Sequence, residues 1–168
     1  MLQLYYGDGK GKTTAAVGAV VRMIGAGGRA GFVQFLKNGD SSELAALRRL
    51  GVDCIVARES YQLFEAMTPA RTQQLADVYR ALLADALHRR AEWNLLVLDE
   101  VLDACAMKLL DPNALCRALH ASPGNCEVIL TGHAPLPALT DAADYITHFR
   151  CERHPYAHGA AARKGIEF

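Results

Sequence analysis

A glycine-rich segment near the start of the chain, residues 7–14, follows a short apolar run and leads into a pattern typical of a helix. A strand, a tight turn and a helix in this order are the setting of a phosphate-binding loop. Glycines let backbone N–H groups point at a phosphate, while Lys12 supplies a positive charge and Thr13 a hydroxyl for Mg²⁺. A helix that begins near Gly11 adds the positive end of its dipole. We therefore predict a nucleoside-triphosphate site here.

The segment departs from the usual phosphate-binding loop at its first position. Tyr6 stands where that pattern has a glycine, so the loop is one residue shorter than the usual form. We expect the Lys12 side chain to lie in a solvated part of the loop and not in the core. The residues predicted to bind the nucleotide are Gly7, Asp8, Gly9, Lys10, Gly11, Lys12, Thr13 and Thr14.

Short apolar runs alternate with helical patterns along the rest of the chain. The runs of strand length are residues 2–6, 31–36, 54–57, 95–98, 128–130 and 145–149. The helical patterns are residues 14–24, 40–51, 68–90 and 111–121. Strands that alternate with helices pair in parallel. The sequence therefore predicts one α/β domain over residues 1–168, a P-loop (RecA-like) fold with a mostly parallel sheet and helices on both faces.

A pair of carboxylates follows the apolar run 95–98. A strand that ends in an acidic residue, here Asp99, is the usual partner of a phosphate-loop threonine in holding Mg²⁺. Glu100 has three interpretations, because it could bind the metal, orient a water or be a solvated carboxylate in the first turn of a helix. We predict that Thr13, Asp99 and Glu100 hold the metal and that Lys12 and Glu100 are the catalytic residues.

A third strand end carries Thr131, Gly132 and His133. The threonine and glycine either approach the nucleotide from a neighbouring strand or form an ordinary turn into a helix. His133 is a candidate general base, although a single histidine in a loop more often has no catalytic role.

Charge and cysteine content narrow the class of protein. Lys plus Arg and Asp plus Glu both total 18, so the basic surface of a general nucleic-acid binder is not expected. The 5 cysteines form no CxxC pair, which favours free thiols in a reducing compartment. The sequence has no apolar run long enough to span a membrane, and it starts directly with a strand. We expect a cytoplasmic protein that binds neither nucleic acid nor membrane.

With these motifs in place, the chain resembles the P-loop class of ATP:corrinoid adenosyltransferases nearly from end to end. The segments that carry the resemblance are residues 7–16, 33–37, 97–100, 130–132, 154–156 and 162–168. The resemblance implies that cobalt of a reduced corrinoid, cob(I)alamin, attacks C5′ of ATP and that inorganic triphosphate departs. It also implies ATP held in the reverse of the usual direction, with Mg²⁺ or Mn²⁺ as the metal.

This chemistry needs no general base. Charge on the departing triphosphate would be stabilised by Lys12, Lys10, the loop amides and the metal. The resemblance further implies a homodimer and a flavoprotein electron donor as partners. It places Arg163 near the substrates. The basic and aromatic arm 150–168 either is an exposed tail or reaches across a cofactor or another subunit.

Relatives displace the lower ligand of cobalt with aromatic residues in a Phe-x-Trp motif. Residues 58–67 occupy the corresponding stretch and lack that motif. Tyr61 and Phe64 are the substitutes that we predict to contact the corrinoid. The alternative is that both side chains pack on the core beneath a loop.

Two other functions also fit a phosphate-binding loop. A P-loop small-molecule kinase would need a general base near the acceptor and usually an arginine-bearing lid. A RecA-like ATPase module would couple hydrolysis to a protein or nucleic-acid partner.

Overall fold

The computed structural model describes residues 1–57, 59–61, 65–121, 125–153, 159 and 163–166. Its strands are β1 (Leu2–Tyr6), β2 (Ala30–Gln34), β3 (Asp53–Val56), β4 (Leu95–Asp99), β5 (Glu127–Gly132) and β6 (Tyr145–His148). Its helices are α1 (Lys12–Gly25), α2 (Ser42–Arg49), α3 (Pro69–Arg89), η1 (Arg90–Glu92), α4 (Val101–Ala106), α5 (Pro112–Ala121) and α6 (Pro137–Thr140).

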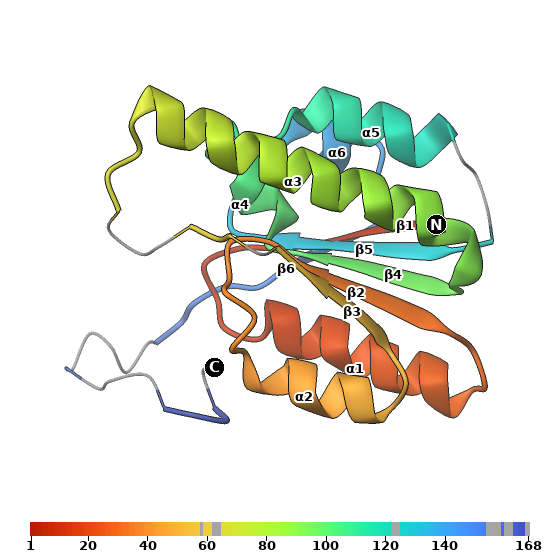
Figure 1. The fold of residues 1–168 in the computed structure, drawn as a ribbon. Helices are drawn as coiled ribbons and strands as arrows, with labels where there is room; N and C mark the ends of the chain where they lie inside the picture. The colour runs from red at the N-terminus through yellow and green to blue at the C-terminus, as the bar shows by residue number, and fades with distance from the viewer. Residues whose placement is uncertain (58, 62–64, 122–124, 154–158, 160–162, 167–168) are drawn as a thin grey trace.

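The six strands form one sheet in the order β3-β2-β4-β5-β1-β6, and every pairing is parallel. Helices α1 and α2 cover one face, while α3, α4, α5 and α6 cover the other (Figure 1). The predicted α/β fold with helices on both faces is therefore confirmed.

The core consists of two apolar layers, one on each face of the sheet. Successive residues of β4 alternate between them: Leu95 and Val97 pack towards α1 and α2, whereas Leu96 and Leu98 pack towards α3 and α5. All five residues of β4 are buried. This explains why the central strands are mostly apolar, since a strand covered on both faces has no solvent side. Strand β6 lies at an edge of the sheet and is exposed.

Several boundaries differ from the sequence prediction. Helix α3 begins at Pro69, one residue after the start of the predicted pattern 68–90, because Thr68 is its cap: the Thr68 hydroxyl accepts a hydrogen bond from the N–H of Arg71 (3.2 Å). Helix α2 begins after Ser41, whereas Asp40 is hydrogen-bonded to Asn38 in the preceding loop. Helices α4 and α6 were not predicted because six and four residues are too few to show helical periodicity.

Because all strands are parallel, their carboxyl ends lie together at one end of the sheet, where ligands bind in folds of this kind. This end carries the loop after β1, the turn after β2 and the residues that follow β4 and β5. In the part of the chain that the structure describes, no helix has both the length and the apolar content needed to cross a bilayer.

Candidate nucleotide and metal site

The glycine-rich loop is shaped by the chain segment that leaves β6. The N–H of Gly9 donates to the carbonyl of Phe149 (2.8 Å), and the N–H of Gly7 donates to the carbonyl of His133 (3.0 Å). A Cβ on Gly7 would lie 2.2 Å from the Phe149 oxygen, and one on Gly9 would lie 2.7 Å from the Phe149 carbonyl carbon. Glycine at both positions therefore permits close packing of two backbones, a reason that the sequence analysis did not give. Tyr6, at the position of the missing glycine, stacks on His148.

Replacing Gly9 with Ala should destabilise the protein and weaken ATP binding together. The added methyl group meets backbone atoms, so the loop and residues 149–150 must separate, at a cost of about 1–3 kcal/mol. Gly18 is the matched control, because a Cβ there meets open space in the middle of α1, where Ala is favoured by about 0.5–1 kcal/mol. Urea unfolding and nucleotide titration of both variants test this. Equal stability of the two variants would contradict the close packing.

Lys12 is buried, so the predicted solvated position of its side chain is wrong. Its ammonium donates to the carbonyls of Gly7 (2.7 Å) and Gly9 (3.0 Å), and only 8% of the residue is exposed. The loop curls so that these carbonyls face the start of α1. The first intrahelical bond runs from Ala15 N–H to the Gly11 carbonyl (2.8 Å), so the preceding N–H groups of α1 point out of the helix, as a bound anion requires.

Asp99 lies at the centre of the site with no exposed surface. Its Oδ1 accepts hydrogen bonds from the hydroxyls of Thr13 (2.9 Å) and Thr131 (2.8 Å). Its Oδ2 accepts from the amide of Gln34 (3.2 Å) and the ammonium of Lys37 (3.0 Å). The fold thus brings together Thr13 and Asp99, which the sequence analysis paired from separate motifs.

Glu100 is the residue before α4 and has a left-handed backbone (φ 62°). Its N–H donates to the Thr131 hydroxyl (2.9 Å), and its side chain is 18% exposed. Burial, a hydrogen bond with Asp103 and the charge of Asp99 raise the pKa of Glu100 to about 8. The interpretation as a solvated carboxylate in a first helical turn is therefore wrong, and Glu100 belongs to a crowded acidic cluster.

Without bound metal, Glu100 should make the protein less stable as the pH rises. Its native pKa of about 8 exceeds the ordinary value of 4.5, so the native state holds the extra proton between these values. The stabilisation is complete below pH 4.5 and is lost towards pH 8, by up to about 1.4 kcal/mol per pH unit. Glu100→Gln should remove this slope from urea unfolding measured in EDTA, whereas Glu92→Gln on the surface should not. An identical slope in wild type and Glu100→Gln would contradict the raised pKa.

His133 lies beside the acidic cluster and is paired with Asp103. Its Nδ1 is 3.1 Å from a carboxylate oxygen of Asp103, and its side chain is 62% exposed. One ligand atom each from Glu100, Asp103 and His133 lie within 4.8 Å of one another. Thr131, from the same strand end, contacts Asp99 directly, so this strand end does reach the site.

Gln34 and Lys37 are functional candidates to which the sequence analysis gave no role. Both follow from the strand order, which places β2 beside β4 and so brings the end of β2 to Asp99. The signal in the sequence is a glutamine within an otherwise apolar strand. Although burial lowers it, the pKa of Lys37 is raised overall by the charges of Asp99 and Glu100.

A cavity of about 320 Å³ opens beside the loop. Its walls come from the starts of α1 and α2, from the turn after β2 and from the C-terminal arm. The lining residues are Thr13, Thr14, Val17, Lys37, Ser42, Glu43, Gly165 and Ile166. Residues 165–166 therefore lie beside the candidate site although they come from the far end of the chain.

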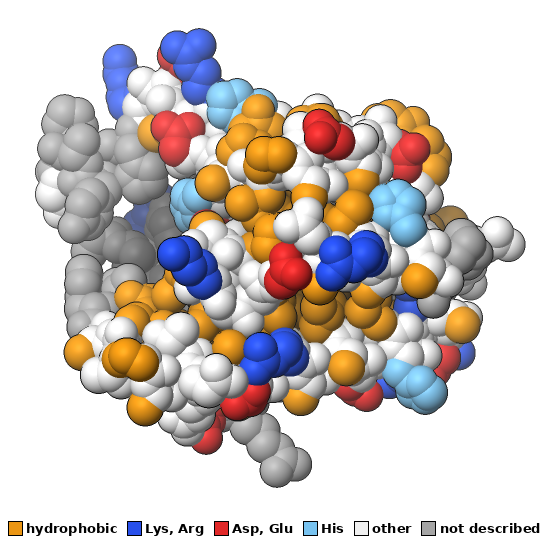
Figure 2. All heavy atoms as spheres, turned by 90° about the horizontal axis from the view of Figure 1, so that it is seen from above, with side chains coloured by type: hydrophobic (Ala, Val, Ile, Leu, Met, Phe, Trp, Pro, Cys, Tyr) orange, Lys and Arg blue, Asp and Glu red, His pale blue; other side chains and the backbone are white. Residues whose placement is uncertain are grey.

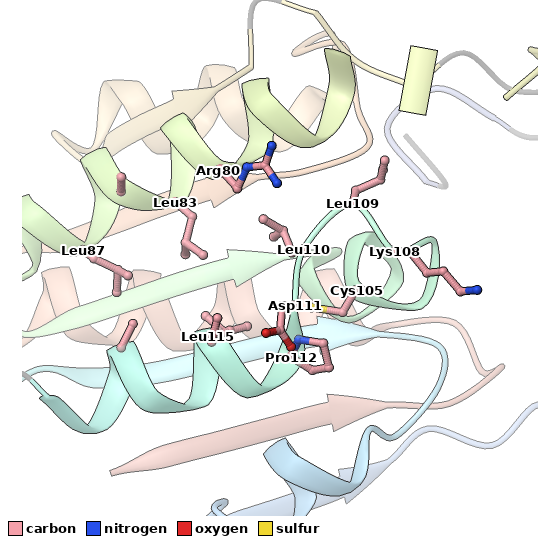
Figure 3. A pocket seen from close by; sticks show the side chains of 13 residues that line it. Arg80, Leu83, Leu87, Cys105, Lys108, Leu109, Leu110, Asp111, Pro112 and Leu115 are labelled. Carbon is pink, nitrogen blue, oxygen red and sulfur yellow. The ribbon is translucent and has the colours of Figure 1, made fainter. Parts of the chain in front are cut away.

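A larger cavity of about 540 Å³ lies on the opposite face of the sheet. Figure 2 looks onto this face, where hydrophobic side chains gather between charged ones. Leu83 and Leu87 of α3 face Leu115 of α5 across the cavity, Asp111 lies beside Pro112, and Lys108 stands towards one end (Figure 3). None of the loop residues 7–14 lines it. The smaller cavity is therefore the candidate nucleotide site.

Other predicted site residues occupy the border of this region. The Asp8 carboxylate accepts a hydrogen bond from the N–H of Cys151 (3.1 Å), which lowers its pKa. Lys10 and Thr14 are exposed. Arg163 is exposed, and its carbonyl accepts a hydrogen bond from the N–H of Ile166 (3.1 Å).

The loop predicted to meet the corrinoid is attached to the start of α3. Arg71 donates to Glu65 (3.0 Å), to Glu59 (3.1 Å) and to the carbonyl of Ser60 (3.1 Å). Tyr61 is half-buried against the core, and its N–H donates to the hydroxyl of Tyr79 (3.2 Å). Phe64 lies outside the described residues.

Comparison with known proteins identifies the family. The family model described as "ATP:corrinoid adenosyltransferase BtuR/CobO/CobP" matches residues 1–168. The corrinoid adenosyltransferase of Pseudomonas aeruginosa is 30% identical over 100% of this chain and 83% of its own length. Corrinoid adenosyltransferase CobA of Salmonella typhimurium is 32% identical over 98% of this chain and 84% of its own length.

Among solved structures, the cytoplasmic domain of EssC matches 97% of this chain and 36% of its own, with a TM-score of 0.53 and 15% identity. That likeness shows the fold alone. The family match extends over the loop, the carboxylates Asp99 and Glu100 and the C-terminal arm alike. The chain therefore belongs to the ATP:corrinoid adenosyltransferase family BtuR/CobO/CobP.

Proposed function

We propose that the loop 7–14 and the cavity beside it hold the triphosphate of ATP while a reduced corrinoid takes up the adenosyl group. The family reaction transfers the 5′-deoxyadenosyl group of ATP to corrinoid cobalt. The observation that carries the placement is the hydrogen bond between Thr13 and Asp99 at the wall of this cavity. It joins the start of α1, where an anion would bind, to the acidic end of β4.

The residues around Asp99 fit a hard divalent cation. They offer oxygen atoms from Thr13, Asp99 and Glu100, the donor type that Mg²⁺ and Mn²⁺ prefer. Burial, the hydrogen bond with Asp103 and the charge of Asp99 raise the pKa of Glu100, and a bound cation would offset these effects by stabilising the ionised carboxylate. The Oε1 atom of Gln34 is buried and has no hydrogen-bond partner among the described residues, which leaves an acceptor for a metal-bound water. When bound, the metal would neutralise charge on the triphosphate.

The reaction is a displacement at C5′ of ATP. The electron pair of Co(I) forms the cobalt–carbon bond, the C5′–O bond breaks, and its electrons leave with the triphosphate. No proton has to be removed, so His133 needs no catalytic role. Lys12 would turn from the carbonyls of Gly7 and Gly9 to a phosphate oxygen, and Lys10 and the α1 N–H groups would share the remaining charge.

An anaerobic assay with ATP and chemically reduced corrinoid tests this function. The visible spectrum of the corrinoid should change to that of the alkylated form, and triphosphate should appear in equal amount. ADP as the product would instead indicate a kinase, and phosphate release without corrinoid would indicate an ATPase module. The family match favours neither alternative.

The loop held by Arg71 is our candidate for displacing the lower ligand of cobalt. Tyr61→Ala or Phe64→Ala should slow transfer when Co(II) corrinoid must be reduced on the protein. Either change should matter much less when Co(I) is supplied, because that species already lacks a lower ligand. Tyr61→Phe keeps the ring and should retain activity.

A packing role for these aromatic residues predicts a different result. The alanine variants would then lose activity in both assays and would also be less stable. The loss in the free energy of unfolding would be roughly 3–5 kcal/mol if Phe64 were fully buried. Spectroscopy of the Co(II) corrinoid with protein and ATP separates the two. A four-coordinate signal that persists in both alanine variants would assign the displacement to another residue.

The C-terminal arm and the partners complete the proposal. Residues 165–166 line the nucleotide cavity, which supports a role for the arm 150–168, including Arg163, over the substrates. We propose a homodimer supplied with electrons by a flavoprotein, working in the cytoplasm. The five cysteines are free, which agrees with a reducing compartment. Light scattering tests the homodimer, and reduction assays with a purified flavoprotein test the electron supply.

A further inference from the structure

One ammonium group stands among three carboxylates at the proposed metal site. The Nζ atom of Lys37 lies 3.0 Å from Asp99, 3.8 Å from Glu43 and 3.9 Å from Glu100. Asp99 is fully buried and the other two carboxylates are largely buried. Carboxylates crowded in this way are stabilised by a positive charge nearby, because desolvated anions repel one another strongly. Lys37 supplies that charge in the free protein.

Two hydrogen bonds hold the main chain just before Lys37 in place. The N–H of Phe35 donates to the carbonyl of Asp99 (2.9 Å), and the N–H of Leu36 donates to the hydroxyl of Tyr79 (3.2 Å). Leu36 has a left-handed backbone (φ 57°), which turns the chain back towards the site. The long side chain of Lys37 can therefore change direction while its backbone stays in place.

Lys37 also faces the proposed triphosphate position. It lines the 320 Å³ cavity together with Thr13 and Thr14, so the residue that pairs with the carboxylates also borders the space for the nucleotide. A divalent cation held by Asp99 and Glu100 would stand within a few ångströms of this ammonium, and like charges at that distance repel. Metal and ammonium thus compete for the same oxygens until another anion arrives.

We infer that Lys37 is a resident counter-ion that keeps the site closed to free divalent cations and moves to the triphosphate when ATP binds. The inference rests on the proposed metal position at Asp99 and Glu100. It makes metal binding depend on ATP, since only the nucleotide offers the ammonium another set of oxygens. A metal ion that arrives without nucleotide has to displace a bound charge.

Mn²⁺ titration of the free protein, followed by the electron paramagnetic resonance signal of unbound Mn²⁺, tests this without ATP or corrinoid. Lys37→Met should bind Mn²⁺ at least about tenfold more tightly than wild type, because the competing charge is gone. Lys108→Met is the matched control, since Lys108 is exposed in the turn after α4, and it should bind like wild type. Equal affinity in Lys37→Met and wild type would overturn the inference.

A second pair of variants covers the case in which Lys37→Met does not fold. Lys37→Met combined with Glu43→Gln removes one charge of each sign, and its reference is Glu43→Gln alone. The double variant should bind Mn²⁺ at least about tenfold more tightly than this reference, and equal affinity would overturn the inference. The proposed function is tested separately from this inference. A wild-type protein that does not transfer the adenosyl group would refute the proposed function, whatever the Mn²⁺ affinities of the variants are.

Discussion

Replacing Asp99 with Asn should lower the free energy of unfolding by roughly 3–5 kcal/mol, because the substitution removes a fully buried charge that is paired with Lys37 and accepts four hydrogen bonds. Each carboxylate oxygen accepts two hydrogen bonds, from Thr13 and Thr131 on one side and from Gln34 and Lys37 on the other. The amide nitrogen of Asn would have to face one of these pairs of donors. Adenosyl transfer by the remaining folded protein should need a higher Mg²⁺ concentration.

Urea unfolding at neutral pH in EDTA measures the first effect, and a metal titration of the transfer rate measures the second. Asp85→Asn is the control, because Asp85 is exposed on α3 and should change stability by less than about 0.5 kcal/mol. If Asp99→Asn were as stable as this control, the four hydrogen bonds would not hold the site together. An unchanged metal titration would leave Glu100 as the ligand that matters.

Lys12→Met should reduce the rate of adenosyl transfer by about 10²–10³-fold, the usual effect of losing one group that stabilises developing negative charge. Methionine keeps an unbranched apolar side chain, so most of the packing around the buried lysine is retained. The carbonyls of Gly7 and Gly9 lose their donor, which should cost about 1–3 kcal/mol of stability.

Steady-state rates with Co(I) corrinoid and saturating ATP provide the measurement. Lys108→Met should retain wild-type activity, which controls for the loss of a positive charge in general. A Lys12→Met protein that is folded and has wild-type activity would be incompatible with the phosphate-binding role of the loop.

The strands and long helices were predictable because their patterns are local. The apolar run of β4 and the capping of α3 by Thr68 are each contained within a few residues. The pairing of Thr13 with Asp99 was predictable too, since each motif has a known partner chemistry.

The surroundings of Asp99 could not be predicted, because they depend on the order of strands in the sheet. Gln34 and Lys37 are 65 and 62 residues away along the chain and reach Asp99 only because β2 lies beside β4. The burial of Lys12 has a similar cause, since it depends on how the loop curls. A periodicity or a motif contains no information about either arrangement.

The packing of Phe149 against Gly7 and Gly9 also bears on the order in which the protein is made. Strand β1 leaves the ribosome before the segment, about 140 residues later, from which its loop acquires its shape, as the hydrogen bond between Asp8 and Cys151 shows (sequence separation 143). Contacts of such separation form late, because the chain must first close a very large loop. A nascent chain that ends at β5 therefore has the lysine and threonine for ATP but lacks the backbone that shapes the loop. We therefore expect nucleotide binding to begin only after the segment that follows β6 has been made.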